Sequence, residues 1–207
     1  AWTSFFPDEG YCQAQAPVAA TLLMHMPLEE AFHCFLQICT KYLPGYYSAG
    51  LEAVQLDGAI LFALLKSVDP GRYKLLKKLG VDPSLYMIEW FMCIFCRTLP
   101  WPTVLRIWDM FFCEGVKILI RVGLVLLRFG IDRSCKEMFE VVESLKNIPA
   151  PVKQVNFLLA KMFELRLTDD DFEKMHYRQV KLRRKQKHKD EVARQKRAAA
   201  TASASKR

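Results

Sequence analysis

Apolar residues recur at helical spacing along nearly the whole chain, and Pro or Gly interrupts the pattern at intervals of about one helix length. Runs that alternate apolar with polar residues, which would indicate strands, are absent. No fixed repeat recurs, which argues against a solenoid. We therefore predict an all-α fold, an orthogonal array of several helices without a β-sheet. Helices are expected over 27–43, 51–68, 69–80, 83–99, 102–115, 116–130, 134–148 and 151–165.

The size of the chain suits one domain with a substantial core, since 52% of its 207 residues are hydrophobic. No run of 18 uninterrupted apolar residues occurs, so we predict no membrane-spanning helix. The first residues, AWTSFF, include no start methionine and no secretory signal. We therefore expect a chain that is truncated at its N-terminus.

The seven cysteines are odd in number, and several lie in apolar helical pattern. This usage predicts reduced core thiols in a cytosolic protein rather than disulfides. Cys93 and Cys96 form a CxxC unit inside the apolar sequence WFMCIFC, and no second such unit occurs. A zinc site needs more ligands than this pair supplies, so we favour core packing and predict no metal site.

The net charge of +8 is unevenly distributed along the chain. From Lys174 onward there are 13 Lys or Arg and two acids, whereas the body before it holds 17 basic and 20 acidic residues. We predict a body over 1–167 and a basic helix over 168–197, capped by Thr168 with three aspartates in its first turn. A disordered tail is expected over 198–207.

Three interpretations of the basic helix remain open. It is a solvated extension, or it is attracted to the anionic cytoplasmic leaflet of a membrane, or it serves nuclear targeting or nucleic-acid contact. From Lys174 onward Tyr177 is the only aromatic residue, which argues against stacking on nucleic-acid bases. The candidate membrane contacts are Arg183, Arg184, Lys185, Lys187 and Lys189.

Two uncharged amides, Gln13 and Gln15, lie just ahead of Pro17. Pro17 has no N–H, so the carbonyl of Gln13 cannot receive an i+4 hydrogen bond, and a helix either begins near Pro17 or is disturbed there. An outward-pointing glutamine amide can hold a water molecule while it donates to a phosphate oxygen, as in GTP hydrolysis. The simpler alternative is that both glutamines satisfy backbone groups at the start of the helix.

Cys12 is a second candidate for chemistry, because a thiol near a helix start can have a lowered pKa. A cysteine nucleophile also needs a positioned base, and the spacing of His25 and His33 pairs neither of them with Cys12. The phosphate-loop, HExxH and dinucleotide-binding motifs are absent as well. The pattern therefore disfavours a cysteine hydrolase.

Longer stretches of the sequence carry a family resemblance. GYCQAQAPVAATLLM resembles the glutamine-bearing motif of the TBC domain, the GTPase-activating domain for Rab GTPases. EWFMCIFCRTLPWPTVLRIWDMFFCEGVKILIRVGLVLL resembles that family's long downstream block. The wording DEGYCQAQAPVA, KYLPGYYS, LEAVQLDG and WDMFFCEGVKI is similar to the member-ten/carabin branch. The resemblance covers roughly residues 1–180 and implies the multi-helix array of the TBC type.

In that family an arginine and a glutamine enter the active site of the GTPase. The arginine neutralises charge on the transferring phosphoryl group, and the glutamine of a Y-x-Q motif positions the attacking water. The resemblance gives Gln13 the catalytic role, with Gly10, Tyr11 and Cys12 as the supporting motif, and gives Gln15 none.

The resemblance also implies the biological setting. It implies that the chain is a GTPase activator and not itself an enzyme, and that its partner is a Rab-type GTPase in the GTP form. GTP and Mg are bound by that partner, so the chain needs no cofactor of its own. It implies a cytoplasmic protein of vesicle trafficking, peripheral at plasma or endosomal membranes. The rival function is a non-catalytic Rab-binding or scaffold module at membranes.

The arginine of the family has no counterpart in this chain. Its motif, I-x-x-D-x-x-R, is expected upstream of the glutamine, but only 12 residues precede Gln13 and none is arginine. The segment from Asp69 to Arg72 imitates the motif, yet Lys66 stands where isoleucine belongs and the segment follows the glutamine. We therefore expect that the arginine finger and the first helices are missing, that packing is poor where those helices dock, and that the chain alone is largely inactive. Such an arginine is worth about 10³–10⁵ in rate.

Arg106 and Asp109 lie three residues apart on one predicted helix and are expected to pair locally. A contact with the GTPase is the alternative for this pair. Four large aromatic residues at helical spacing are predicted to be core rather than binding surface. They are Trp90, Trp108, Phe111 and Phe112.

Overall fold

The computed structural model of this chain describes residues 2–204, with side chains through residue 195. Every regular element in this part is a helix, which confirms the prediction of an all-α fold without a β-sheet. The chain divides after Leu167 into a first unit, which holds helices α1 to α10, and a second unit, which is formed by α11. None of the described helices combines the length and the hydropathy that crossing a bilayer requires.

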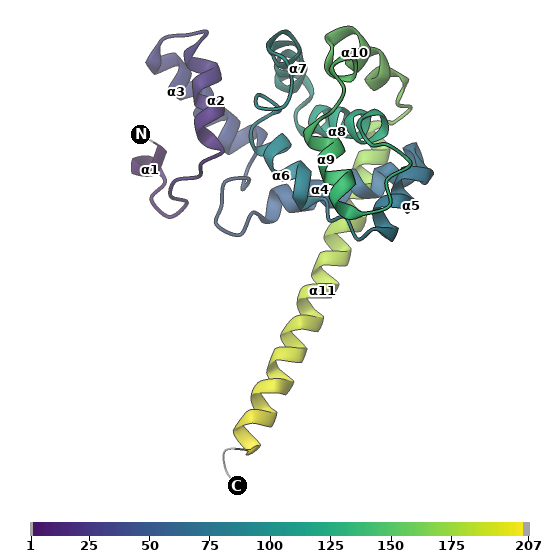
Figure 1. Ribbon diagram of the computed structural model, residues 1–207. Coiled ribbons are helices and arrows are strands. Elements are labelled where there is room, and N and C mark those ends of the chain that lie inside the picture. Colours follow the sequence, from purple (N-terminus) through teal and green to yellow (C-terminus); the bar gives the residue numbers. More distant parts are fainter. Residues whose placement is uncertain (1, 205–207) are drawn as a thin grey trace. The chain divides into compact units, whose positions relative to one another are not determined.

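The first unit begins with three helices that lie together in Figure 1. They are the short α1 (Trp2–Phe5), α2 (Gln15–Leu23) and α3 (Leu28–Gln37), which continues as a π-helical turn over Ile38–Tyr42. Helices α2 and α3 pack against each other, and Val18 of α2 is fully buried. The loop with Gly10 and Gln13 lies in this group, between α1 and α2.

The centre of the first unit is α8 (Val116–Gly130), the helix with the longest run of buried apolar residues. It packs against α4 (Glu52–Val68), α6 (Ser84–Met92) and α7 (Trp101–Glu114), and also against α9 and α10. Gly123 permits the close approach of these helices, because a Cβ atom there would lie 3.1 Å from Cδ1 of Leu61 on α4.

The remaining helices of the first unit surround this centre (Figure 1). They are α5 (Pro70–Lys78), α9 (Met138–Lys146), a 3₁₀ turn (Ala150–Lys153) and α10 (Val155–Glu164). The helices predicted over 69–80, 134–148 and 151–165 are present as α5, α9 and α10. Helices α9 and α10 begin four residues later than predicted.

The prediction of one helix over 83–99 is wrong in its second half. Helix α6 ends at Met92, and Ile94 and Phe95 adopt positive φ angles of 47° and 58°. Both side chains are fully buried, and the Trp108 indole N–H donates to the carbonyl of Ile94 at 3.0 Å. An apolar run does not distinguish a buried helix from a buried turn, because both place their side chains in the core.

The core assignment of the aromatic residues is correct for three of the four. Trp90, Trp108 and Phe111 are buried. Phe112 is 38% exposed, so its assignment to the core is wrong. Its ring meets Tyr42 edge-on at a centroid distance of 5.6 Å, on the outer side of α7. Helical spacing alone does not show whether this residue lies on the buried face of α7 or just outside it.

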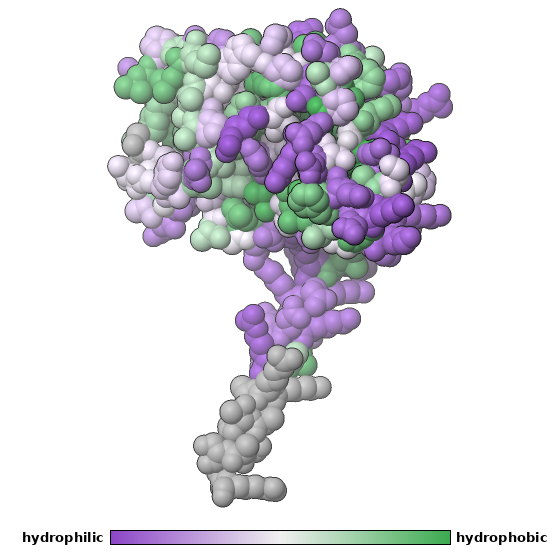
Figure 2. All heavy atoms as spheres, viewed as in Figure 1, coloured by the Kyte–Doolittle hydropathy of each residue, from purple (hydrophilic) through white to green (hydrophobic). Residues whose placement is uncertain are grey.

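The second unit is the single helix α11 (Asp169–Ala204). Thr168 caps it as predicted, because its hydroxyl accepts from the Asp171 N–H at 3.3 Å while the Asp171 carboxylate accepts from the Thr168 N–H at 2.8 Å. The helix extends to Ala204, past residue 197 where the basic helix is expected to end and the predicted tail over 198–207 to begin; alanine favours helix in this segment. The last three residues of that predicted tail lie outside the described part. Figure 2 shows that hydrophilic residues dominate the part of α11 coloured by hydropathy.

Candidate functional site

The predicted catalytic motif forms the loop between α1 and α2. Gly10 has a φ angle of +68°, a conformation that other residues rarely adopt, and its N–H donates to the Phe6 carbonyl at 3.3 Å. Beyond this turn Tyr11 is 71% exposed, and the side chain of Gln13 is exposed as well. Glycine therefore sets the turn after which the motif reaches the surface.

The start of α2 confirms the prediction that a helix begins near Pro17, whose missing N–H leaves the carbonyl of Gln13 without its i+4 donor. The helix begins at Gln15, and the carbonyl of Gln13 accepts instead from the Ala16 N–H at 3.3 Å, one residue short of the helical partner. This is the bond that remains when Pro17 has no N–H to donate. The backbone of Gln13 is thus anchored while its amide side chain faces outward.

The two glutamines have different structural roles. Gln15 is only 4% exposed, and its Oε1 accepts from the N–H of Cys12 at 3.3 Å. The backbone-satisfying role that the sequence left open for both residues therefore belongs to Gln15. The signal in the sequence is the spacing, because a glutamine side chain three residues after Cys12 can accept from that residue's free N–H at the start of a helix.

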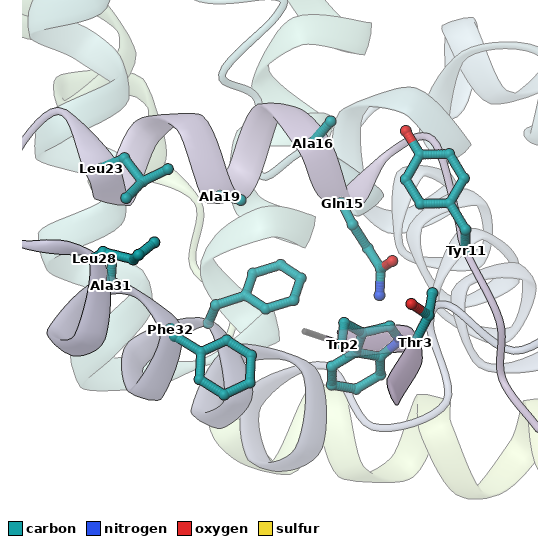
Figure 3. Close-up of a pocket in the computed structure, with 11 residues that line it drawn as sticks. Trp2, Thr3, Tyr11, Gln15, Ala16, Ala19, Leu23, Leu28, Ala31 and Phe32 are labelled. Carbon is teal, nitrogen blue, oxygen red and sulfur yellow. The ribbon is translucent and has the colours of Figure 1, made fainter. Parts of the chain in front are cut away.

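A mostly apolar cavity of about 270 Å³ lies beside this loop, between α1, α2 and α3 (Figure 3). Its walls include Trp2, Phe32 and Leu28, and Tyr11 stands at one edge. The amide of Gln15 points from the start of α2 toward the side of Trp2 (Figure 3). Neither Nε2 of Gln15 nor Nε1 of Trp2 has an acceptor among the described residues. The wall of this cavity thus contains two buried donors without a partner among the described residues.

The cysteines near the motif are built into the core rather than into a reactive site. The Cys93 thiol lies 3.9 Å from the carbonyl of Ala14, and burial raises the pKa of Cys93 to about 12. Burial and the charge of Glu9 likewise raise the pKa of Cys39 to about 12. A thiol with such a pKa is protonated near neutral pH and is a poor nucleophile.

The histidines do not supply a base for Cys12. His25 stacks on Trp101 at a centroid distance of 5.7 Å. The hydrogen bonds recorded for Cys12 within the described chain involve only its backbone. The nucleophile–base pair that a cysteine hydrolase requires is therefore not found in this region.

Arg72, the formal imitation of the arginine motif, is committed to a structural role. Its Nη1 lies 2.6 Å from Oδ2 of Asp69, and its Nε and Nη2 donate to the carbonyl of Ile131 at 3.3 and 3.1 Å. All three guanidinium nitrogens therefore have intramolecular partners, which agrees with its rejection on sequence grounds.

The predicted pair on α7 forms. Nη1 of Arg106 lies 3.5 Å from Oδ2 of Asp109, and both side chains are largely exposed. An exposed pair at this spacing contributes at most about 0.5 kcal/mol to stability. Both side chains can therefore leave this pair at little cost and contact a partner protein instead. On α11 the candidate membrane residues Arg184, Lys185, Lys187 and Lys189 are exposed, whereas Arg183 is partly buried.

Comparison with known proteins places this chain in a family. The model of the Rab-GTPase-TBC domain matches residues 1–132. TBC1 domain family member 10B of Mus musculus is 59% identical over 186 residues, which cover 87% of this chain and 23% of that protein. Carabin of Mus musculus is 48% identical over 174 residues, which cover 82% of this chain and 39% of that protein. The chain thus spans less than half the length of these relatives.

A solved structure agrees with this assignment. The crystal structure of the Chlamydomonas flagellar RabGAP TBC domain superposes with a TM-score of 0.66 at 28% sequence identity. The match covers 78% of this chain and 55% of that chain. The sequence and the fold therefore agree that this chain belongs to the Rab-GTPase-TBC domain family, in the branch that includes the member-ten proteins and carabin.

Proposed function

We propose that this chain is a GTPase-activating domain for a Rab-type GTPase and that Gln13 is the side chain it inserts into the partner's active site. The observation that carries the proposal is the exposed amide of Gln13 on an anchored backbone, within the Y-x-Q motif of a TBC-family chain. An anchored backbone limits the conformational entropy that the loop loses when the amide docks.

Gln13 supplies hydrogen bonds and no covalent chemistry in this proposal. Its amide oxygen accepts a hydrogen bond from the attacking water, and its NH₂ group donates to an oxygen of the γ-phosphate. The water oxygen then bonds to the γ-phosphorus while the bond from that phosphorus to the β–γ bridging oxygen breaks. The GTPase binds GTP and Mg and is the hydrolase, so this chain acts as its regulator.

The proposal includes a weak activity for these 207 residues alone. No arginine precedes Gln13 in the sequence, and the guanidinium of Arg72 is held by Asp69 and Ile131. Without a cation at the phosphoryl group, about 10³–10⁵ of the acceleration is not available. Positioning of the water by Gln13 is the part that this chain provides.

The test is single-turnover GTP hydrolysis across a panel of Rab GTPases. The chain is compared with the longest natural form of the protein that contains it, each with and without Gln13→Ala. Gln55→Ala, which removes another exposed glutamine on α4, is the matched control. We expect Gln13→Ala to reduce the stimulated rate about 10²-fold, by analogy with the loss of one transition-state donor, and Gln55→Ala to leave it unchanged.

A second arm uses a Rab whose own water-positioning glutamine has been replaced by alanine. Stimulation that persists with this Rab and disappears with Gln13→Ala supports a glutamine supplied in trans. Binding of a Rab without acceleration by any form would instead establish the scaffold function, because Gln13 would then be only a helix-start residue.

We also propose that α11 attracts the domain to an anionic membrane surface, at the cytoplasmic face of an endosomal or plasma membrane. No acid occurs between Lys174 and Lys189, and Arg184, Lys185 and Lys189 are exposed. Each basic residue near such a surface contributes about 1 kcal/mol. Three exposed cations thus suffice for a measurable attraction.

Vesicle sedimentation tests this second proposal. The full chain is expected to bind vesicles that contain phosphatidylserine, to lose this binding as salt is raised, and to ignore vesicles of phosphatidylcholine alone. The double variant Lys185→Glu/Lys189→Glu should abolish binding. Equal binding of the variant, or equal binding to both vesicle types, would contradict an electrostatic role for α11.

A further inference from the structure

The turn over residues 93–96, directly after α6, combines backbone strain with complete burial. Ile94 and Phe95 have positive φ angles of 47° and 58°, a conformation that β-branched and bulky residues rarely adopt. Both side chains are fully buried. Strain of this kind persists only where the surrounding contacts enforce it, and it is concentrated at functional sites. The turn is therefore a candidate for a role beyond filling the core.

Two buried side chains hold the backbone of this turn in place. The hydroxyl of Tyr47 donates to the carbonyl of Met92 at 2.9 Å. The indole N–H of Trp108 donates to the carbonyl of Ile94 at 3.0 Å. Both donors belong to core residues, and Tyr47 is 45 residues away from Met92 in the sequence. Contacts with distant segments thus determine the path of the chain through the turn.

The turn presents the two thiols of the CxxC unit to the segment that carries Gln13. The sulfur of Cys93 lies 3.9 Å from the carbonyl oxygen of Ala14, the residue next to Gln13. The thiol of Cys96 lies beside the side chain of Thr21, further along α2. The CxxC unit, for which the sequence predicts only core packing, therefore supports the start of α2 at two points.

The contact between Cys93 and Ala14 acts on the position of the loop more than on stability. Burial raises the pKa of Cys93 to about 12, so the thiol keeps its proton near neutral pH and can donate. A thiol is a weak donor, so the contact stabilises the fold only slightly. Ala14 joins the loop to α2, however, and a shift of its carbonyl moves Gln13 directly.

We propose that Cys93 is a positioning residue for Gln13. The turn after α6 holds the thiol against Ala14, and this contact fixes the loop from which the Gln13 amide reaches the GTPase. The inference rests on the proposed function, because the position of the amide matters only if Gln13 enters the active site of the partner. A displacement of about 1 Å in a group that orients a reactant can cost about 10²-fold in rate. Cys93 itself is buried and acts only through Gln13.

Single-turnover GTP hydrolysis by a Rab tests this role. The longest natural form of the protein that contains this chain is compared with its Cys93→Ala variant over a range of activator concentrations. We expect the maximal stimulated rate to fall about tenfold, less than the loss of about 10²-fold expected for Gln13→Ala. The activator concentration that gives half the maximal rate should stay within about twofold, since the interface is unchanged. Cys93→Ser keeps a donor at this position and should retain most of the rate.

A double variant separates positioning from a general loss of stability. In the Gln13→Ala background, Cys93→Ala should have no further effect on the rate, because Cys93 acts through Gln13. The matched control is Cys135→Ala. It removes another buried thiol, whose sulfur lies 3.8 Å from Oγ of Ser144, in the loop before α9. This control should leave the stimulated rate unchanged.

Amide hydrogen exchange of the 207-residue chain provides a readout that needs no GTPase. The N–H of Cys12 donates to Oε1 of Gln15, and the N–H of Gln15 donates to the carbonyl of Cys12. Cys93→Ala should make both amides exchange several-fold faster, because the loop opens more often when its support is removed. Cys135→Ala should leave the exchange of these amides unchanged.

The outcomes distinguish this inference from the proposed function. An unchanged rate for Gln13→Ala would overturn the proposed function, and the inference with it. A full effect of Gln13→Ala together with an unchanged rate for Cys93→Ala would overturn the inference alone. An additive loss in the double variant, or an equal loss for Cys135→Ala, would show that Cys93 acts through stability and would also overturn it.

Discussion

Replacement of Asp69 by asparagine tests the buried charge network that holds α5 against the end of α8. The Asp69 side chain is 5% exposed and accepts from the N–H of Arg72 at 3.0 Å, from Nη1 of Arg72 at 2.6 Å and from Arg133 at 3.3 Å. Asparagine is nearly isosteric and caps helices about as well, so the variant removes the charge and keeps the cap.

The size of the effect follows from what Arg72 retains. Loss of one partner of a buried pair costs about 3–5 kcal/mol when the other charge is left unpaired. Here the guanidinium of Arg72 still donates to the carbonyl of Ile131, and its side chain is 13% exposed. We therefore expect Asp69→Asn to lower the free energy of unfolding by about 2–3 kcal/mol. Asp69→Ala should cost about 1 kcal/mol more, because it also removes the cap.

The pH dependence provides a second readout. Burial alone would raise the pKa of Asp69, but hydrogen bonds and charge from Arg72, together with the charge of Arg133, hold it below its usual range. A lowered pKa in the folded state means that the stabilisation is present above the unfolded value of about 3.9 and is lost as pH falls below it. The gap between wild type and Asp69→Asn should thus be constant near neutral pH and close in acid.

Urea unfolding of the full chain at several pH values measures both effects. Asp109→Asn is the matched control, because Asp109 pairs with Arg106 at the same spacing but is 68% exposed. That change should cost less than about 0.5 kcal/mol. A loss of similar size for both variants, or a gap for Asp69→Asn that persists in acid, would refute the assignment of the stabilisation to a buried charge.

Three further predictions follow from other contacts. Gly123→Val should lower the free energy of unfolding by about 1–3 kcal/mol in urea titrations, because its Cβ would lie 3.1 Å from Leu61 and its methyl groups have no room; an unchanged midpoint would contradict this. Gly115→Ala should destabilise the chain by about 1–3 kcal/mol and so lower its melting temperature. Gly115 ends α7 with a φ angle of +70° and a ψ angle of −149°, a conformation that only glycine adopts readily. An unchanged melting temperature would show that the turn can rearrange. Iodoacetamide in mildly alkaline buffer, followed by mass spectrometry, should label exposed Cys113 before Cys39 and Cys93, whose pKa values burial raises to about 12; the reverse order would show that the core opens readily.

The sequence predicted the parts of the candidate site that depend on neighbouring residues. Pro17 cannot donate a hydrogen bond wherever it lies, so the displaced helix start near Gln13 followed from the sequence alone. The end of α7 at Gly115 and the cap of α11 at Thr168 also depend only on residues close in the sequence. The resemblance to the TBC domain likewise rested on residues read in order, and the comparisons confirm it.

Which of the two amides, Gln13 or Gln15, is buried was not predictable in this way. Both residues lie in the same local pattern, and only the packing of α1 and α3 around α2 buries one amide and leaves the other exposed. The burial of Gln15 and the exposure of Gln13 therefore depend on neighbours that are distant in the local sequence pattern.

Local sequence by itself determined that this chain is helical, where most helices begin and end, and which family it belongs to, because caps, prolines and apolar spacing act over a few residues. The tertiary structure decided the turn at Ile94 and Phe95, where burial of both side chains offsets two positive φ angles. It also brought Arg72 to the carbonyl of Ile131, 59 residues away, and buried the hydroxyl of Tyr86 where no other described residue bonds to it. These features arise from contacts between distant segments, whose geometry only the folded chain specifies.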